Sequence, residues 1–132
     1  MTDGELLARF EALALTPAEL THREHVRLAF SVLAQERELA PAAIRFRTML
    51  RRFADANGAG AKYHETITWA YLFLIHERMR DGETWDGFAE RNADLLVWRP
   101  SILDRYYRPE TIASDRARHR FILPDAVYED FR

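Results

Sequence analysis

Three of the five histidines carry the clearest chemical signal in this sequence. His22 and His25 are three residues apart, so their side chains would lie on one face of a helix. His64 stands next to the acidic residue Glu65, much later in the chain. Imidazole is a common metal ligand and a general base near neutral pH, so a site built from these three side chains could bind a metal or move a proton.

The elements that would have to bring these histidines together are helices. Hydrophobic periodicity, helix caps and the positions of proline and glycine predict helices over residues 4–15, 17–38 or 22–38, 41–57, 62–80 and 85–92. The start of the second helix remains open between two sites. Both Thr16 and Thr21 are followed three residues later by a glutamate, as in a capping box.

Short connections between these helices would place the histidines at one end of a bundle. Such connections favour antiparallel neighbours, so the second and fourth helices would begin at the same end. His22 and His25 lie at the start of the second helix, and His64 lies at the start of the fourth. We therefore expect the three imidazoles to converge. His76 lies too far along the fourth helix to join them, and the irregular C-terminal part gives no position for His119.

A metal site is the first function that this cluster predicts. We expect His22, His25 and His64 to bind a divalent ion such as Zn, Fe, Ni or Mn. Glu65 or Glu24 could add a carboxylate ligand or orient an imidazole. Three protein ligands would leave a coordination position open for water or substrate. Without a metal, the helix N-termini would keep the imidazoles neutral, as a general base requires, and could attract an anionic substrate.

A small-molecule pocket is expected beside the histidines, because His64 and Tyr71 share one helical face. We predict Glu65 and Tyr71 as catalytic side chains of an enzyme that acts on a small organic molecule. Two other functions remain open: a binding protein that holds a ligand or metal without turnover, and an accessory subunit with structural histidines. In that last case His22 would lie on the surface, and His25 and His64 would be hydrogen-bonded core residues.

The composition predicts one all-α domain over residues 1–132. The hydrophobic content of 48% is sufficient for a core at this length. Strand signals are weak throughout, so we expect a bundle of four to five helices followed by an irregular segment that is broken by Pro100, Pro109 and Pro124. Residues 67–75 are apolar nearly all round, which predicts that the fourth helix is central.

Other features exclude several classes of protein. The chain contains no cysteine, which excludes disulfides and thiolate chemistry and is compatible with a cytoplasmic location. Its polar, acidic start lacks the features of a signal peptide, and no apolar run is long enough to cross a membrane. The net charge of −2 argues against nucleic-acid binding. A homodimer remains open, because most oligomers of small proteins are symmetric pairs.

Two groups of arginines are spaced along predicted helices. Their simplest interpretation is a solvated surface, and the alternative is an anionic ligand or partner. The first group is Arg45, Arg47, Arg51 and Arg52, and the second is Arg116, Arg118 and Arg120.

The two histidine segments resemble a family of small bacterial helical proteins of unassigned function. They read Thr-His-Arg-Glu-His-Val-Arg-Leu-Ala at residues 21–29 and Lys-Tyr-His-Glu-Thr-Ile-Thr at residues 62–68. Weaker similarity covers residues 106–109 and 117–125. The resemblance implies that the two histidine segments belong together, and it implies no reaction. The chain departs from the family at residues 126–132, which are acidic and aromatic where a proline-rich ending is usual.

Overall fold

A computed structural model describes residues 1–126, and residues 127–132 of the acidic, aromatic end lie outside the described residues. Within residues 1–126 the secondary structure is entirely helical, which confirms the predicted all-α class. The α-helices in that range are α1 (Asp3–Glu11), α2 (His22–Glu36), α3 (Leu39–Ala56), α4 (Glu65–Arg78), α5 (Trp85–Arg91), α6 (Pro109–Ile112) and α7 (Asp115–His119). Short 3-10 helices are η1 (Gly60–Lys62), η2 (Ala93–Leu95) and η3 (Ile102–Arg105).

The number of helices is somewhat higher than the four to five predicted. Helices α1 to α5 each have seven residues or more and correspond to the predicted segments. The two additional helices, α6 and α7, have four and five residues and lie in the C-terminal part that was expected to be irregular. Over residues 1–126, no helix combines the length and apolarity that a membrane span requires.

The connection between α1 and α2 decides where α2 begins. Helix α1 stops before its predicted end, because Leu13 adopts a left-handed conformation with φ of 58°. Thr16 and Glu19 then close a turn of their own. The Glu19 carboxylate accepts a hydrogen bond from the Thr16 N–H, and the Thr16 hydroxyl accepts one from the Glu19 N–H. The capping pattern of Thr16 and Glu19 thus closes a separate turn, and α2 starts at the second pattern, that of Thr21 and Glu24.

The ends of α2 and α3 follow the capping residues of the sequence. Thr21 caps α2, because its hydroxyl accepts a hydrogen bond from the N–H of Glu24. Pro41 lies within the first turn of α3, where its missing N–H leaves no helical hydrogen bond unmade. Gly58 follows the end of α3 in the left-handed conformation, with φ of 67°. These observations confirm the expected cap of α2 and the expected stop of α3.

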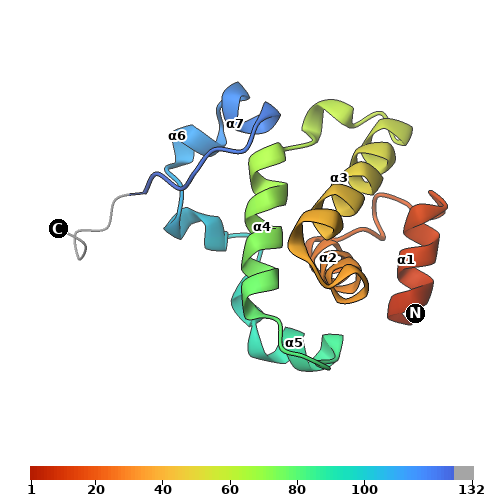
Figure 1. Ribbon diagram of the computed structural model, residues 1–132. Coiled ribbons are helices and arrows are strands. Elements are labelled where there is room, and N and C mark those ends of the chain that lie inside the picture. The colour runs from red at the N-terminus through yellow and green to blue at the C-terminus, as the bar shows by residue number, and fades with distance from the viewer. Residues whose placement is uncertain (127–132) are drawn as a thin grey trace.

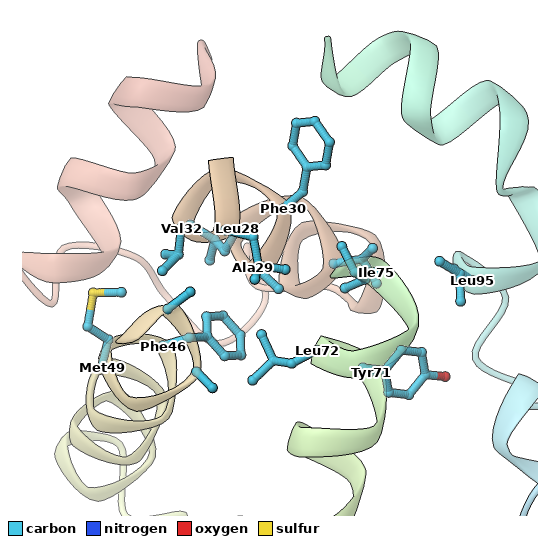
Figure 2. Packing of buried hydrophobic residues seen from close by; sticks show 14 of the residues in the cluster. Leu28, Ala29, Phe30, Val32, Phe46, Met49, Tyr71, Leu72, Ile75 and Leu95 are labelled. Carbon is cyan, nitrogen blue, oxygen red and sulfur yellow. The ribbon is translucent and has the colours of Figure 1, made fainter. Parts of the chain in front are cut away.

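Helix α4 is the centre of the molecule, as predicted. It contacts α2 and α3 on one side and α7 on the other, and it lies between these two parts of the chain in Figure 1. Leu72 and Ile75 of α4 are fully buried and meet Leu28, Ala29 and Phe46 in the main core (Figure 2). Removing these apolar surfaces from water is the main source of stability in a domain of this kind.

The helices around α4 cross it and do not form an up-and-down bundle. In Figure 1, α2 is seen nearly along its axis whereas α4 is seen from the side. The up-down-up arrangement expected from the short connections, in which α2 and α4 would run parallel, is therefore wrong for this pair. Their starts nevertheless lie near one cavity, as described below, because crossed helices can also bring their N-terminal ends together.

The C-terminal part is tied to α4 by buried hydrogen bonds. The Thr66 hydroxyl donates to the carbonyl oxygen of Arg120 and accepts from the N–H of Ile122, at 2.7 and 3.1 Å. Tyr107 adds a hydrogen bond from its hydroxyl to the Ile122 carbonyl oxygen at 2.7 Å. Thr66 is 0% exposed. These contacts hold residues 120–122 against the start of α4, next to His64.

Candidate functional site

A cavity of about 550 Å³ lies among α2, α3 and α4, and His22, His25 and His64 all line it. Three histidines that are far apart in the sequence are thereby brought to one site. The exposed residues that mark its opening are Pro17, Asn57, Lys62 and Trp98. Its apolar wall includes Val26, Ala29, Phe46, Leu50, Phe53, Ile67, Leu72 and Ile75. A polar opening above an apolar interior is the usual construction of a small-molecule pocket.

His22 is held between two aromatic rings. Its Nε2 is 2.8 Å from the carbonyl oxygen of Leu95, so this nitrogen carries the proton and donates. Its ring centroid lies 5.2 Å from that of Tyr71 and 5.1 Å from that of Trp98. In the neutral ring Nδ1 is then an acceptor, and it has no hydrogen-bond partner among residues 1–126.

His25 is fixed by its own helix. Its Nδ1 lies 3.0 Å from the carbonyl oxygen of Thr21 and donates to it, which leaves Nε2 as the acceptor. Nε2 has no partner in the described part of the chain. In that part no fully buried side-chain nitrogen or oxygen lacks a partner, so the free nitrogens of His22 and His25 are both accessible from the pocket or from solvent.

His64 has a structural role that the other two lack. It is the N-cap of α4, and its Nδ1 accepts a hydrogen bond from the N–H of Ile67 at 3.1 Å. Its Nε2 donates to the carbonyl oxygen of Ile112 at 2.7 Å. Both ring nitrogens are therefore occupied, and the ring is neutral because Nδ1 must be unprotonated to accept. His64 thus joins the start of α4 to the end of α6.

All three imidazoles are held in the neutral form. Burial lowers the pKa of His22 below its usual value, and the hydrogen bond to Leu95 opposes this only in part. Burial also lowers the pKa of His25, with a further contribution from His22. The pKa of His64 is lowered by burial and by the positive charge of Arg118. At neutral pH the free ring nitrogens of His22 and His25 can accept a proton, whereas both nitrogens of His64 are already hydrogen-bonded.

No group of three or more histidine, aspartate or glutamate side chains in residues 1–126 is placed to hold a metal ion. The geometry of His64 gives a reason, since this ring would have to release one of its two hydrogen bonds before it could bind a metal. The metal site of His22, His25 and His64 is therefore not found within that range, and metal binding stays a prediction.

The two glutamates expected to support the histidines lie elsewhere. Both Glu65 oxygens accept from Nε of Arg47, at 2.8 and 2.9 Å, and the Tyr63 hydroxyl donates to one of them at 2.5 Å. Burial opposes ionisation of Glu65, but these hydrogen bonds hold its pKa below its usual value. Glu24 pairs with Arg27 on the side of α1. Neither carboxylate lines the histidine pocket.

Tyr71, the other expected catalytic residue, does line the pocket. Its ring forms part of the wall next to His22, and its hydroxyl lies 3.3 Å from the Ser101 hydroxyl. Figure 2 shows the phenol oxygen directed away from Leu72 and the main core. Burial raises the pKa of Tyr71, so its hydroxyl stays protonated. The geometry makes Tyr71 a wall residue whose hydroxyl shares a hydrogen bond with the Ser101 hydroxyl, in which either oxygen can be the donor.

Sequence reasoning missed Trp98, Lys62 and Asn57 as pocket residues. Trp98 lies in a turn, Lys62 ends the short helix η1 and Asn57 caps the end of α3, so hydrophobic periodicity gives no positional information for them. Trp98 is 45% exposed, which is unusual for a large aromatic side chain, and it contacts His22. The expected absence of His76 from the pocket agrees with its exposed position on α4. His119 lines a different cavity.

Comparisons with known proteins add no relative. No family model matches the chain, and neither a curated protein nor a solved structure matches it. Membership of the small bacterial family that the histidine segments resemble therefore stays a prediction.

Proposed function

We propose that this protein is a small-molecule enzyme in which His22 and His25 form a general-base pair at the opening of an apolar pocket. The observation that carries the proposal is the pocket itself: each of these two neutral imidazoles lines it and has one ring nitrogen without a partner among residues 1–126. A neutral imidazole with a free nitrogen is the form that removes a proton.

The lining of the pocket supports one class of substrate. A largely apolar molecule with one weakly acidic C–H or O–H group would place its apolar body against α3 and α4 and its acidic group near the histidines. The proton would move to the imidazole nitrogen, and the electron pair of the broken bond would stay on the substrate. Lys62, at the opening, would favour the negative charge that develops.

A probe reaction tests the general base without knowledge of the natural substrate. The probe is 5-nitrobenzisoxazole, a small planar molecule with one acidic C–H, whose ring opens to a coloured phenolate when the proton is removed. We expect a saturable rate that is constant above about pH 6.5 and falls below it, because protonated imidazole is not a base.

The variants His22→Gln and His25→Gln should each lower this rate at least tenfold. Their amides can still donate to the Leu95 and Thr21 carbonyl oxygens, so folding should be retained and can be checked by circular dichroism. His76→Gln is the matched control, because His76 is exposed and outside the pocket. Equal rates in all four proteins would contradict the general-base role.

A binding protein without turnover is the competing class. Screening of small aromatic and aliphatic acids and phenols by NMR would then find ligands that shift the signals of Ala29 and Ile75, deep in the pocket, with no accelerated proton transfer. That result would favour a ligand carrier over an enzyme. An accessory subunit with structural histidines would show neither effect.

A metal ion at His22 and His25 is a second candidate, favoured by the two free nitrogens on one helical face. Two imidazoles would hold Zn, Fe, Ni or Mn only if water or substrate completed the coordination. Titration of tag-free protein should show stoichiometric uptake that His22→Gln and His25→Gln abolish. Uptake that requires His64 would instead support the original three-histidine site. No uptake of any of these ions would remove the metal from the proposal.

A further inference from the structure

A second cavity, of about 210 Å³, lies on the other side of Tyr63 and brings the two arginine groups of the sequence together. Tyr63 lines both cavities. Arg47 and Arg51 come from α3 and Arg118 comes from α7. Arg51 and Arg118 are 67 residues apart in the sequence, and both line this one small cleft. A solvated surface would not gather them in this way.

Arg47 is held in a fixed orientation with its outer nitrogens free. Its Nε donates to both oxygens of Glu65, whose carboxylate is also held by the Tyr63 hydroxyl. Within residues 1–126, the two terminal nitrogens of Arg47 have no hydrogen-bond partner. Fixing the guanidinium in advance lowers the entropy lost when an anion binds to those nitrogens.

Arg51 is exposed, and it has no salt bridge in the described residues. Its guanidinium carbon lies 5.4 Å from the centre of the Tyr63 ring, within the range of a cation–π contact. Within residues 1–126, Arg118 pairs only with Asp115 on its own helix, and its positive charge lowers the pKa of His64. These two cations lie on opposite elements of the cleft, α3 and α7.

The side chains that line the cleft are positively charged on balance. Three guanidinium groups and two carboxylates, those of Glu65 and Asp55, form the lining, and the Asp115 carboxylate pairs with Arg118 from outside it. The Glu65 carboxylate is already satisfied by Arg47 and Tyr63, and the Asp55 carboxylate lies against the backbone of Gly60. The volume corresponds to about seven water molecules at ~30 Å³ each, which is enough for a small oxyanion and part of its hydration shell.

We propose that this cleft binds a phosphate group, through the guanidinium groups of Arg47, Arg51 and Arg118. Guanidinium groups donate paired hydrogen bonds to neighbouring phosphate oxygens, and three of them from two helices suit a tetrahedral anion better than a single carboxylate. His119 lines the same cleft, and its Nδ1 lies 2.8 Å from the Asp115 carbonyl oxygen. This site is independent of the function proposed for the histidine pocket.

The test is a titration with sodium phosphate at constant ionic strength, followed by the melting temperature and by the NMR signals of the arginine Nε–H groups. We expect a saturable rise in melting temperature and shifts confined to the arginines of the cleft. Arg51→Gln and Arg118→Gln should each weaken phosphate binding at least tenfold. Arg52→Gln is the matched control, because Arg52 is exposed on the same helix and does not line the cleft.

Arg47→Gln is not suitable as the main variant, since it would leave the Glu65 carboxylate without its principal partner and could unfold the start of α4.

Phenyl phosphate distinguishes two sources of the anion. Tighter binding than inorganic phosphate supports a phosphorylated small molecule, and equal binding supports free phosphate. A linear, unsaturable response, an equal effect of sodium acetate, or equal weakening by Arg52→Gln would overturn the proposal.

Discussion

His64 shows how a residue chosen for its chemistry can serve the backbone. Its two ring nitrogens satisfy a helix N–H and a carbonyl oxygen from distant parts of the chain. At a helix start, serine, threonine or aspartate usually accepts the hydrogen bond from such an N–H, and histidine is not a common N-cap. His22 and His25 each use one nitrogen in the same way and keep the other free.

Replacing His64 by alanine should therefore destabilise the protein. The change removes the cap of α4 and the hydrogen bond to Ile112, and we expect a loss of about 2 kcal/mol, or roughly 7 °C in melting temperature. His64→Asn can restore the cap but does not reach Ile112, so it should recover about half of the loss. Urea denaturation of the three proteins measures this. Equal stability of wild type and His64→Ala would show that the cap contributes nothing.

Trp98 should control the protonation of His22. Its ring covers one side of the imidazole, so Trp98→Ala would expose His22 to water. Since burial is what lowers the pKa of His22, we expect this pKa to rise toward its usual value of about 6.5. NMR titration of the imidazole nitrogens gives the shift directly.

Trp69→Ala is the control for this experiment, because Trp69 packs against Phe73 and does not line the pocket. The pKa of His22 should be the same in that variant as in wild type. A similar rise in both variants would mean that general loosening of the fold, and not the cover of Trp98, governs the titration.

For individual residues, the sequence was sufficient to predict that the three histidines lie at one site, but not which of their ring nitrogens are free. The helical spacing of His22 and His25 gave their shared face. Whether a ring nitrogen is free depends on carbonyl groups such as those of Leu95 in η2 and Ile112 in α6, which are distant in sequence. No local pattern in the sequence encodes these partners. The same reason explains why Glu65, adjacent to His64 in sequence, faces a different cavity.

At the scale of elements, α4 joins the histidine pocket to the C-terminal part through Thr66. Its buried hydroxyl is both donor and acceptor to residues 120 and 122. Replacing Thr66 by valine keeps the shape but leaves the Ile122 N–H and the Arg120 carbonyl oxygen without their partner. We expect a loss of about 1–3 kcal/mol and faster hydrogen exchange at the Ile122 amide.

Thr48→Val is the matched control for Thr66→Val. The Thr48 hydroxyl donates only to the Ile44 carbonyl oxygen of its own helix, and the residue is exposed. Its replacement should change stability by less than about 0.5 kcal/mol. If the Ile122 amide exchanges at the same rate in wild type and Thr66→Val, the C-terminal segment is held by its other contacts and not by Thr66.

Helix boundaries were predictable where capping chemistry is local. Gly58 marks the end of α3, because the lack of a side chain allows its left-handed conformation. The capping patterns at Thr16 and Thr21 limited the start of α2 to two sites, and the structure uses Thr21. The end of α1 was not predictable, since Leu13 in the left-handed region breaks a rule that holds for most large residues. The crossing of α2 and α4 also lies beyond the sequence pattern, because it depends on how whole helix surfaces fit together.

In the molecule as a whole, Tyr63 lines two cavities. One is mainly apolar and contains neutral imidazoles, and the other is lined by arginines. Hydrophobic patterning predicted the core, with α4 at its centre. The histidine pocket was expected from the helical face that His64 and Tyr71 share, whereas the arginine cleft was not, because a cavity is the space that packing leaves unfilled. The arginine cleft in particular is formed by two segments that each look like ordinary solvated helix faces.

The three neutral histidines predict how stability depends on pH. In the unfolded chain their pKa values are near 6.5, and in the fold all three pKa values are lower. Below pH 6.5 the unfolded state therefore binds more protons, so the free energy of unfolding falls as the pH falls through this range. Because the rings are only partly buried, we expect a total loss of about 1–2 kcal/mol between pH 7.5 and 5.5.

Urea denaturation at pH 7.5, 6.5 and 5.5 measures this loss. The window is chosen above the range in which the paired carboxylates titrate, since the pKa values of Glu65 and Asp94 are lowered below their usual values of 4.5 and 3.8. The triple variant His22→Gln, His25→Gln, His64→Asn has lower stability at every pH but should show a flatter dependence, because its side chains at these positions do not titrate. A steep loss in the triple variant, or constant stability of the wild type down to pH 5.5, would contradict neutral histidines in the folded protein and with them the general-base pair of the pocket.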